Sequence, residues 1–167
     1  VDKFTEGMRT GELTVIKAPP KIGKTELLRE IAYHTQENTD FHTGVVFLEE
    51  NLKRVAQGFI TKKIKKPVHR RETIVSDQEL RDAFDDIAKK GQLHIFDPRS
   101  EISVENLFNK MDYFVHSKGC KLILIDHISM FAYKAQNFDE RRFLDGFVAD
   151  LKSYASNNDV HIIAVVH

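Results

Sequence analysis

A short segment between an apolar run and an amphipathic run limits the possible folds more than any other part of this chain. Residues 13–16 are largely apolar and typical of a buried strand, whereas residues 26–32 repeat apolar side chains at helical spacing. Phosphate-binding loops occur at such connections, because backbone N–H groups and the helix N-terminus attract phosphate oxygens. We therefore predict a nucleotide-binding loop here. Its residues are Ala18, Pro19, Pro20, Lys21, Ile22, Gly23, Lys24 and Thr25.

The end of this loop carries the predicted chemistry. Gly23 lets the backbone approach the phosphates, Lys24 reaches the β- and γ-phosphates, and the Thr25 hydroxyl binds Mg²⁺. The loop departs from the G-x-x-x-x-G-K-[ST] pattern, because its first position is Ala18 and two prolines, which lack an N–H donor, follow it. Close phosphate contacts are nevertheless expected from Lys21 onward. The alternative is an ordinary strand, turn and helix that happen to contain Gly-Lys-Thr.

Length and composition fit one domain, which we expect to span residues 1–167. The 25 basic and 25 acidic residues balance, so the chain lacks the charge excess of a protein that coats nucleic acid, and any nucleic-acid contact would be local. One cysteine, Cys120, excludes an internal disulfide framework and suits the cytoplasm, which we predict as the location. Neither a signal-peptide pattern nor a run of membrane-spanning length is visible, so we expect no membrane contact.

Strand-like runs alternate with helical segments along the chain. Such alternation is typical of an α/β fold in which helices flank a mostly parallel sheet. The last run is apolar up to the final residue, so we expect the sequence to be cut from a longer polypeptide and the fold to be truncated at its C-terminal end. The predicted strands are 13–17, 44–48, 93–96, 121–125 and 160–166.

Four further helices are expected, and each carries an apolar stripe that we assign to the core rather than to a cofactor site. Ser76 and Glu79 predict a capping box at the start of the second, and Gly91 predicts its end. The residues expected to face inward are Leu52, Val55, Ala56, Phe59 and Ile60; Leu80, Ala83, Phe84 and Ile87; Leu107, Met111, Phe114 and Val115; and Phe143, Phe147, Val148, Leu151 and Ala155.

Carboxylates follow two of the predicted strands. Asp126 ends one apolar run and would hold Mg²⁺ through water; because parallel strands bring their carboxyl ends to one sheet edge, it should lie near Thr25. Glu49 follows the other run and is our candidate for orienting the attacking water and accepting its proton. Glu50 is the alternative, or else begins the next helix. The residue after Asp126 is His127 rather than Glu, which makes Glu49 more necessary.

Four segments together resemble the RecA-like motor of DnaB-type replicative helicases, most closely the helicase half of phage primase-helicases and their mitochondrial relative Twinkle. The resemblance covers nearly the whole chain and implies a RecA-like P-loop NTPase core. It implies that Glu49 is the catalytic base and that Lys24 is a further catalytic residue. It also implies that His167 is a γ-phosphate sensor, although a lone histidine at a strand end is more often structural. It also implies that residues 133–139 face a DNA channel. The segments are 18–25, 47–50, 124–129 and 165–167.

The same resemblance implies a function, cofactors and partners. We expect the ATP-dependent motor core of a hexameric, phage-type replicative DNA helicase, with Mg²⁺ as cofactor and ATP or another NTP or dNTP as fuel. The implied partners are single-stranded DNA, further copies of the chain in a ring, and a primase domain or primase. Three alternatives stay open: a recombinase- or clock-type RecA-like ATPase, a P-loop small-molecule kinase, and a nucleotide-dependent binding module that does not hydrolyse.

Overall fold

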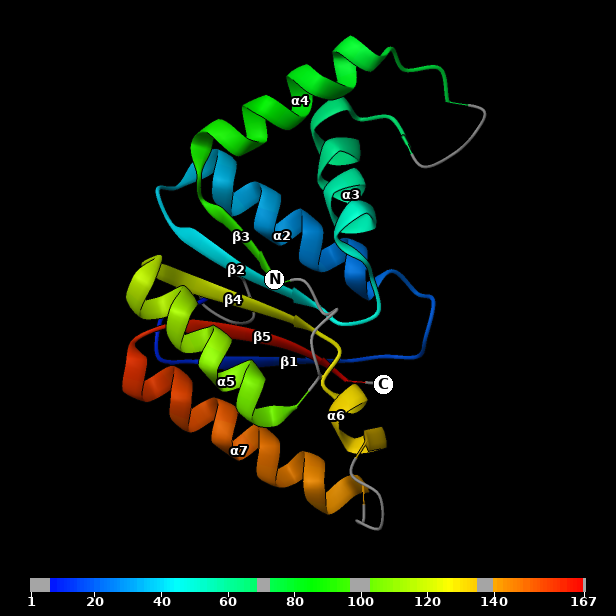
Figure 1. Cartoon of the computed structure of the whole chain (residues 1–167). Coiled ribbons are helices and arrows are strands. Elements are labelled where there is room, and N and C mark those ends of the chain that lie inside the picture. Colours follow the sequence, from blue (N-terminus) through cyan, green and yellow to red (C-terminus); the bar gives the residue numbers. More distant parts are fainter. Residues whose placement is uncertain (1–6, 69–72, 97–102, 135–139, 167) are drawn as a thin grey trace.

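The computed structural model describes residues 7–68, 73–96, 103–134 and 140–166. Within them, five strands form one sheet that lies between two layers of helices (Figure 1). The strands are β1 (Leu13–Lys17), β2 (His42–Phe47), β3 (Leu93–Phe96), β4 (Cys120–Asp126) and β5 (His161–Val166). The helices are α2 (Lys24–Asn38), α3 (Leu52–Ile64), α4 (Asp77–Lys90), α5 (Val104–Asp112), the π-helical turn η1 (Tyr113–Ser117), α6 (Ser129–Lys134) and α7 (Glu140–Asn158).

The sheet order is β1-β5-β4-β2-β3, and the paired strands are parallel. All five predicted strands are confirmed, although β2 begins two residues before the expected Gly44, at the polar pair His42 and Thr43. β4 runs on to include Asp126. Because the strands are parallel, the segments that follow β1, β2 and β4 leave the sheet at the same edge.

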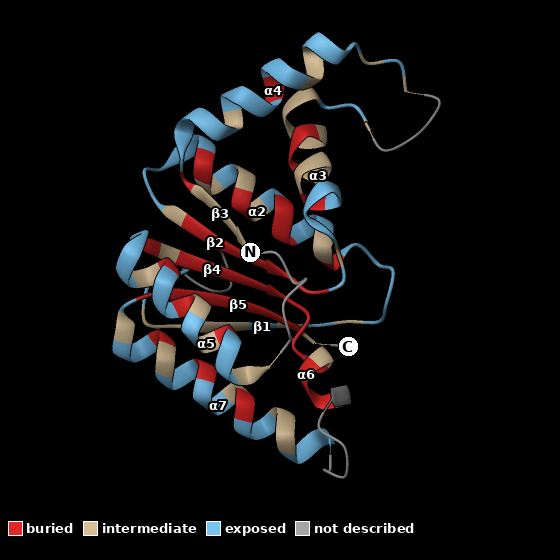
Figure 2. Cartoon of the chain, viewed as in Figure 1, coloured by how far each residue is buried: buried red, intermediate tan, exposed pale blue. Residues whose placement is uncertain are grey.

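Each face of the sheet has its own apolar core (Figure 2). On one face α5, α6 and α7 bury residues such as Met111, Phe147 and Leu151. On the other, α2 and α3 bury Leu28 and Phe59. The two layers hold the strands, and therefore the segments at their carboxyl ends, in fixed relative positions. In the part of the chain that the structure describes, no helix is long and apolar enough to cross a bilayer.

The second capped helix, α4, has the predicted ends but not the predicted burial. The Ser76 side chain caps it, and Gly91 follows it in the left-handed conformation at φ +64°. Ala83 is buried, but Phe84 is 51% exposed, so its expected inward position was wrong, as was that of Leu52, the exposed first residue of α3. The reason is that α4 packs on α3 and the edge strand β3 instead of crossing the sheet. Its apolar stripe borders an open cavity of about 300 Å³.

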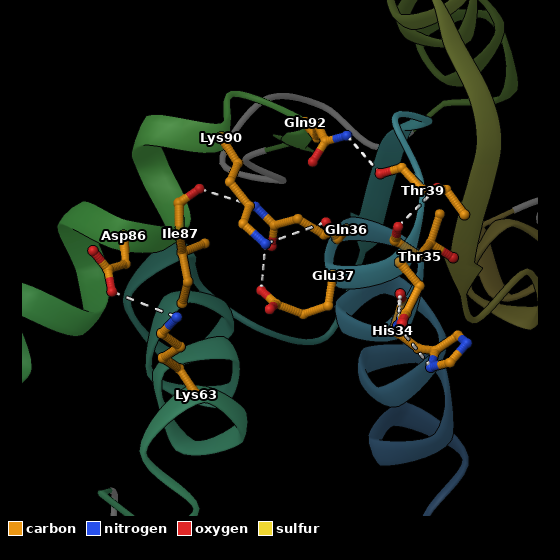
Figure 3. A network of polar contacts seen from close by, with 11 residues as sticks. His34, Thr35, Gln36, Glu37, Thr39, Lys63, Asp86, Ile87, Lys90 and Gln92 are labelled. Atoms are coloured by element: carbon orange, nitrogen blue, oxygen red, sulfur yellow. Dashed lines mark hydrogen bonds and ion pairs between the residues drawn. The ribbon is translucent and has the colours of Figure 1, made fainter.

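Polar contacts tie α4 to the C-terminal end of α2 (Figure 3). Lys90 pairs with Glu37 at 2.7 Å, and Gln36 Nε2 donates a hydrogen bond to the Ile87 carbonyl oxygen at 2.9 Å. The buried face of α2 packs on the sheet at the same time. Helix α2 is therefore held by α4 at its C-terminal end and by the sheet along its buried face. These contacts fix the position of the residues at its N-terminal end.

The helix predicted from the apolar stripe of Leu107, Met111, Phe114 and Val115 is present as α5, but its end widens into η1. Phe114 of this turn is buried, and its ring lies so close to Gly44 of β2 that a Cβ at position 44 would overlap it. Glycine is thus required there by the approach of the ring. The short helix α6, which begins at Ser129, was not predicted, because six residues are too few to show a period.

Candidate functional site

A cleft of about 580 Å³ lies at the carboxyl edge of the sheet, where the segments after β1, β2 and β4 meet the start of α2. Its volume is in the range of small-molecule sites. Most of the predicted loop borders it, whereas the Ile22 side chain is exposed to solvent. The lining residues are Pro20, Lys21, Gly23, Lys24, Thr25, Glu26, Glu49, Asp126, His127 and Met130.

Lys24, the first residue of α2, is buried and lines the cleft. Gly23 before it has φ +98°, a left-handed conformation that favours glycine. The Lys24 ammonium donates hydrogen bonds to the carbonyl oxygens of Ala18 at 2.5 Å and Pro19 at 2.7 Å. The first half of the loop has fewer N–H donors because of its two prolines, but its carbonyl oxygens accept hydrogen bonds from Lys24. Phosphate oxygens of a nucleotide would compete with these carbonyl oxygens for the same ammonium.

Thr25 and Asp126 meet in the cleft as predicted, although 101 residues separate them in the chain. The Thr25 hydroxyl donates a hydrogen bond to Asp126 Oδ2, at the end of β4. A hydroxyl and a carboxylate are hard oxygen donors of the kind that Mg²⁺ takes. Among the described residues no group of three or more His, Cys, Asp or Glu side chains forms a metal cluster. As hard oxygen donors, the Thr25 hydroxyl and the Asp126 carboxylate fit Mg²⁺, and water and phosphate oxygens would complete its shell.

Glu49 and Glu50 are neighbours in sequence, but the structure separates their surroundings. Glu49 lines the cleft, where its Oε1 lies 2.9 Å from Nε2 of His127. Glu50 instead pairs with Arg29 of α2 and, at 3.3 Å, with Arg54 of α3. Only Glu49 is thus placed to meet a water molecule in the cleft, which supports the preference for it over Glu50.

His127 is a site residue whose contact the sequence did not predict. It follows Asp126 through a cis peptide bond and is only 2% exposed. Its hydrogen bond to Glu49 joins the ends of β2 and β4, which pair directly in the sheet. The one signal in the sequence is its place beside Asp126, because adjacent residues at a strand end can both reach the same edge.

Several predicted positions lie outside the described residues. His167, the expected γ-phosphate sensor, is one of them, although β5 ends at Val166 just before it. The expected DNA-channel segment 133–139 begins in α6, and its residues 135–139 are not described. The roles expected for these residues stay predictions.

Comparison with known proteins gives a family and two curated relatives. The model of the family described as the DnaB-like helicase C terminal domain matches residues 1–167. The DNA helicase/primase of Enterobacteria phage T3 is 25% identical over 167 residues, covering 98% of this chain and 30% of the relative. The replicative DNA helicase DnaB of Mycoplasma pneumoniae is 28% identical over 178 residues, covering 98% and 37%. The chain thus spans about a third of the length of these relatives.

Solved structures share the fold. One of them, described as an ATPase domain, superposes with a TM-score of 0.74 at 22% identity, covering 98% of this chain and 60% of that one. A DnaB-like replicative helicase, solved to show its interactions with primase, gives a TM-score of 0.80 at 24% identity and covers 98% and 41%. The predicted RecA-like core, a parallel sheet flanked by helices, is therefore confirmed.

Proposed function

Because the chain belongs to the DnaB-like helicase C-terminal domain family, we propose that it is the ATP-dependent motor of a replicative DNA helicase. In this proposal, hydrolysis of ATP or another nucleoside triphosphate drives translocation on single-stranded DNA. The observation that carries the proposal is the convergence of Lys24, Thr25, Glu49 and Asp126 on one cleft. In this proposal they supply a cation for the phosphates, a hydroxyl and a carboxylate that hold a metal ion, and a base, which together are the parts that phosphoryl transfer to water requires.

Each side chain has a defined task in the proposed reaction. Lys24 binds the β- and γ-phosphates and offsets the negative charge that builds up during transfer. Thr25, directly, and Asp126, through water, would hold Mg²⁺, which supplies further charge neutralisation when bound. Glu49 accepts the proton of the attacking water, and the bond from His127 restrains the Glu49 carboxylate. We retain His167 as the proposed sensor of the γ-phosphate.

The proposed partners follow from the relatives. The phage T3 relative is named a helicase/primase, and one structural neighbour is described together with its interactions with primase. Both descriptions support a primase domain or a primase as a partner. We propose a hexameric ring in the intact protein, with single-stranded DNA in its channel and the cytoplasm, or a host cell's cytoplasm, as its location. Hydrolysis would then be coupled to strand movement between neighbouring subunits.

Unwinding of forked DNA by the full-length protein tests the proposal. The wild type is expected to separate the strands and to release phosphate when Mg-ATP and single-stranded DNA are present. Lys24→Ala should lose both activities, because the loop loses its buried cation at the phosphates. Lys53→Ala is the matched control, since Lys53 is an exposed lysine on α3 outside the cleft. Both variants should melt like the wild type.

Other outcomes would identify the alternatives. Strand exchange without unwinding would indicate a recombinase-type ATPase. Transfer of the γ-phosphate to an acceptor instead of water would indicate a small-molecule kinase. Nucleotide binding without turnover in the assembled protein would indicate a binding module. Each of these results would overturn the helicase proposal while leaving the fold and the family unchanged.

A further inference from the structure

A buried arginine lies directly behind the proposed catalytic cleft. Arg29 of α2 is only 4% exposed and follows Thr25 by about one helical turn. Its guanidinium forms ion pairs with Glu26 on the same helix and with Glu50 after β2. The guanidinium carbon also lies 5.6 Å from the centre of the Phe47 ring. A buried charge held by two carboxylates and an aromatic face has little freedom to move.

The neighbouring helix α3 packs closely against the Arg29 side chain. A Cβ at Gly58 would overlap the Arg29 side chain at Nε, so only glycine leaves room for it. A small cavity of about 100 Å³ next to it is lined by both residues and by Thr61. Arg29 Nε and Thr61 Oγ1 are buried there without a protein hydrogen-bond partner. Helix α3 thus confines the guanidinium sterically, while Glu26 and Glu50 hold it by charge.

The ion pair between Arg29 and Glu50 ties the segment after β2 to helix α2. Glu50 also pairs with Arg54 at 3.3 Å, but that arginine is 69% exposed and its contribution is screened by water. With Glu50 held toward α2 and α3, the adjacent Glu49 lies in the cleft against His127. Helix α2 therefore carries both the proposed phosphate-site residues Lys24 and Thr25 and the residue Arg29. Arg29 in turn holds Glu50, the neighbour of the proposed base Glu49.

We propose that Arg29 is a positioning residue for hydrolysis. By anchoring Glu50 to α2, it fixes the segment after β2 so that the Glu49 carboxylate stays at a set distance from Lys24 and Thr25. Arg29 does not touch the nucleotide itself. This inference rests on the proposed function, because it explains how the segment that carries the base of that reaction is held in place.

The test compares variants in the full-length protein by DNA-stimulated phosphate release. Arg29→Met keeps the length of the side chain but removes its charge, and kcat should fall by about 10- to 100-fold, the effect of misplacing a reacting group by about 1 Å. KM and the Kd for a fluorescent ATP analogue should stay near the wild-type values. Arg54→Met is the matched control, because it removes the exposed partner of the same Glu50, and its kcat should change by less than about twofold.

Two further variants keep the test valid if Arg29→Met folds poorly. Glu50→Gln leaves Glu26 beside the guanidinium, and Gly58→Ala displaces the guanidinium without removing a charge. Both should lower kcat with little change in KM. In a Glu49→Gln background the Arg29→Met change should cost almost nothing more, because a base that has been removed can no longer be misplaced.

The outcomes separate this inference from the proposed function. A wild-type protein that does not hydrolyse ATP would overturn the proposed function. An inactive Glu49→Gln protein beside Arg29→Met, Glu50→Gln and Gly58→Ala variants with wild-type kcat would overturn only the role of Arg29. A fall in kcat that comes together with weaker nucleotide binding and a lower melting temperature would also overturn it, because it would indicate a merely structural ion pair. Additive losses in the Glu49→Gln background would have the same meaning.

Discussion

Replacing Glu49 by Gln should separate nucleotide binding from hydrolysis. The carbonyl oxygen of Gln can accept the hydrogen bond that Glu49 Oε1 now shares with His127 Nε2 at 2.9 Å, so the side chain should keep its place. The amide cannot take up a proton from water, and we expect the rate to fall by about 10²–10⁴, or about 2.7–5.5 kcal/mol of activation free energy. Because the Glu49 side chain is 57% exposed, the free energy of unfolding should change by no more than about 0.5 kcal/mol.

Three measurements on the full-length protein check this prediction. Phosphate release with Mg-ATP and single-stranded DNA reports the loss of rate, and titration with a fluorescent ATP analogue should give a Kd close to that of the wild type. The melting temperature should stay within about 2 °C, the shift that corresponds to 0.5 kcal/mol in a domain of this size. A Glu49→Gln protein that hydrolyses within about threefold of the wild-type rate would refute the assignment. An inactive Glu50→Gln protein beside it would identify Glu50 as the base.

Three more perturbations test the cleft and the core. Lys24→Ala should weaken binding of a fluorescent ATP analogue by at least about 100-fold, because it removes a charge-assisted contact to two phosphates, and near-normal affinity in a folded variant would contradict the phosphate-loop assignment. Gly44→Ala should lower the free energy of unfolding in urea by about 1–3 kcal/mol, since its methyl group overlaps the Phe114 ring; an unchanged midpoint would contradict that packing. Burial and the neighbouring His42 lower the pKa of His94 below 6.5, so the unfolded state takes up its proton first and stability should fall as the pH drops from about 7.5 to 5. Melting curves of His94→Gln should show a smaller fall, and an equal one would exclude His94 as its source.

The strands and the phosphate loop could be predicted because each rests on a local signal. Apolar runs bounded by polar residues mark strands, and a parallel sheet then brings their carboxyl ends together whatever the sequence distance. The meeting of Thr25 with Asp126 is a consequence of topology alone, and it is confirmed by their hydrogen bond. The resemblance to DnaB-type helicases is confirmed by the family match over residues 1–167.

The remaining features depend on which elements pack together, which a single sequence does not encode locally. Phe84 belongs to an apolar stripe of normal helical spacing, but α4 lies outside α3, so half of its surface stays exposed. The pair of Arg29 with Glu26 has a helical spacing of three and could be foreseen, whereas its pair with Glu50 spans 21 residues and depends on the end of β2 reaching α2. The contact of His127 with Glu49 likewise depends on the pairing of β2 with β4.

The two consecutive glutamates after β2 can divide two tasks, anchoring the segment and acting as the proposed base, that a single glutamate could not combine. A carboxylate held by buried Arg29 is committed to an ion pair, which would keep it away from a water molecule in the cleft. A carboxylate without such an anchor would lie on a loop end free to move, and the loss of orientation would lower the rate. Division of the two tasks between Glu50, held behind the cleft, and Glu49, held at its edge by His127, meets both requirements. The same helix begins at Lys24, so α2 connects the proposed phosphate-binding residues to the segment of the proposed base through Arg29 and Glu50.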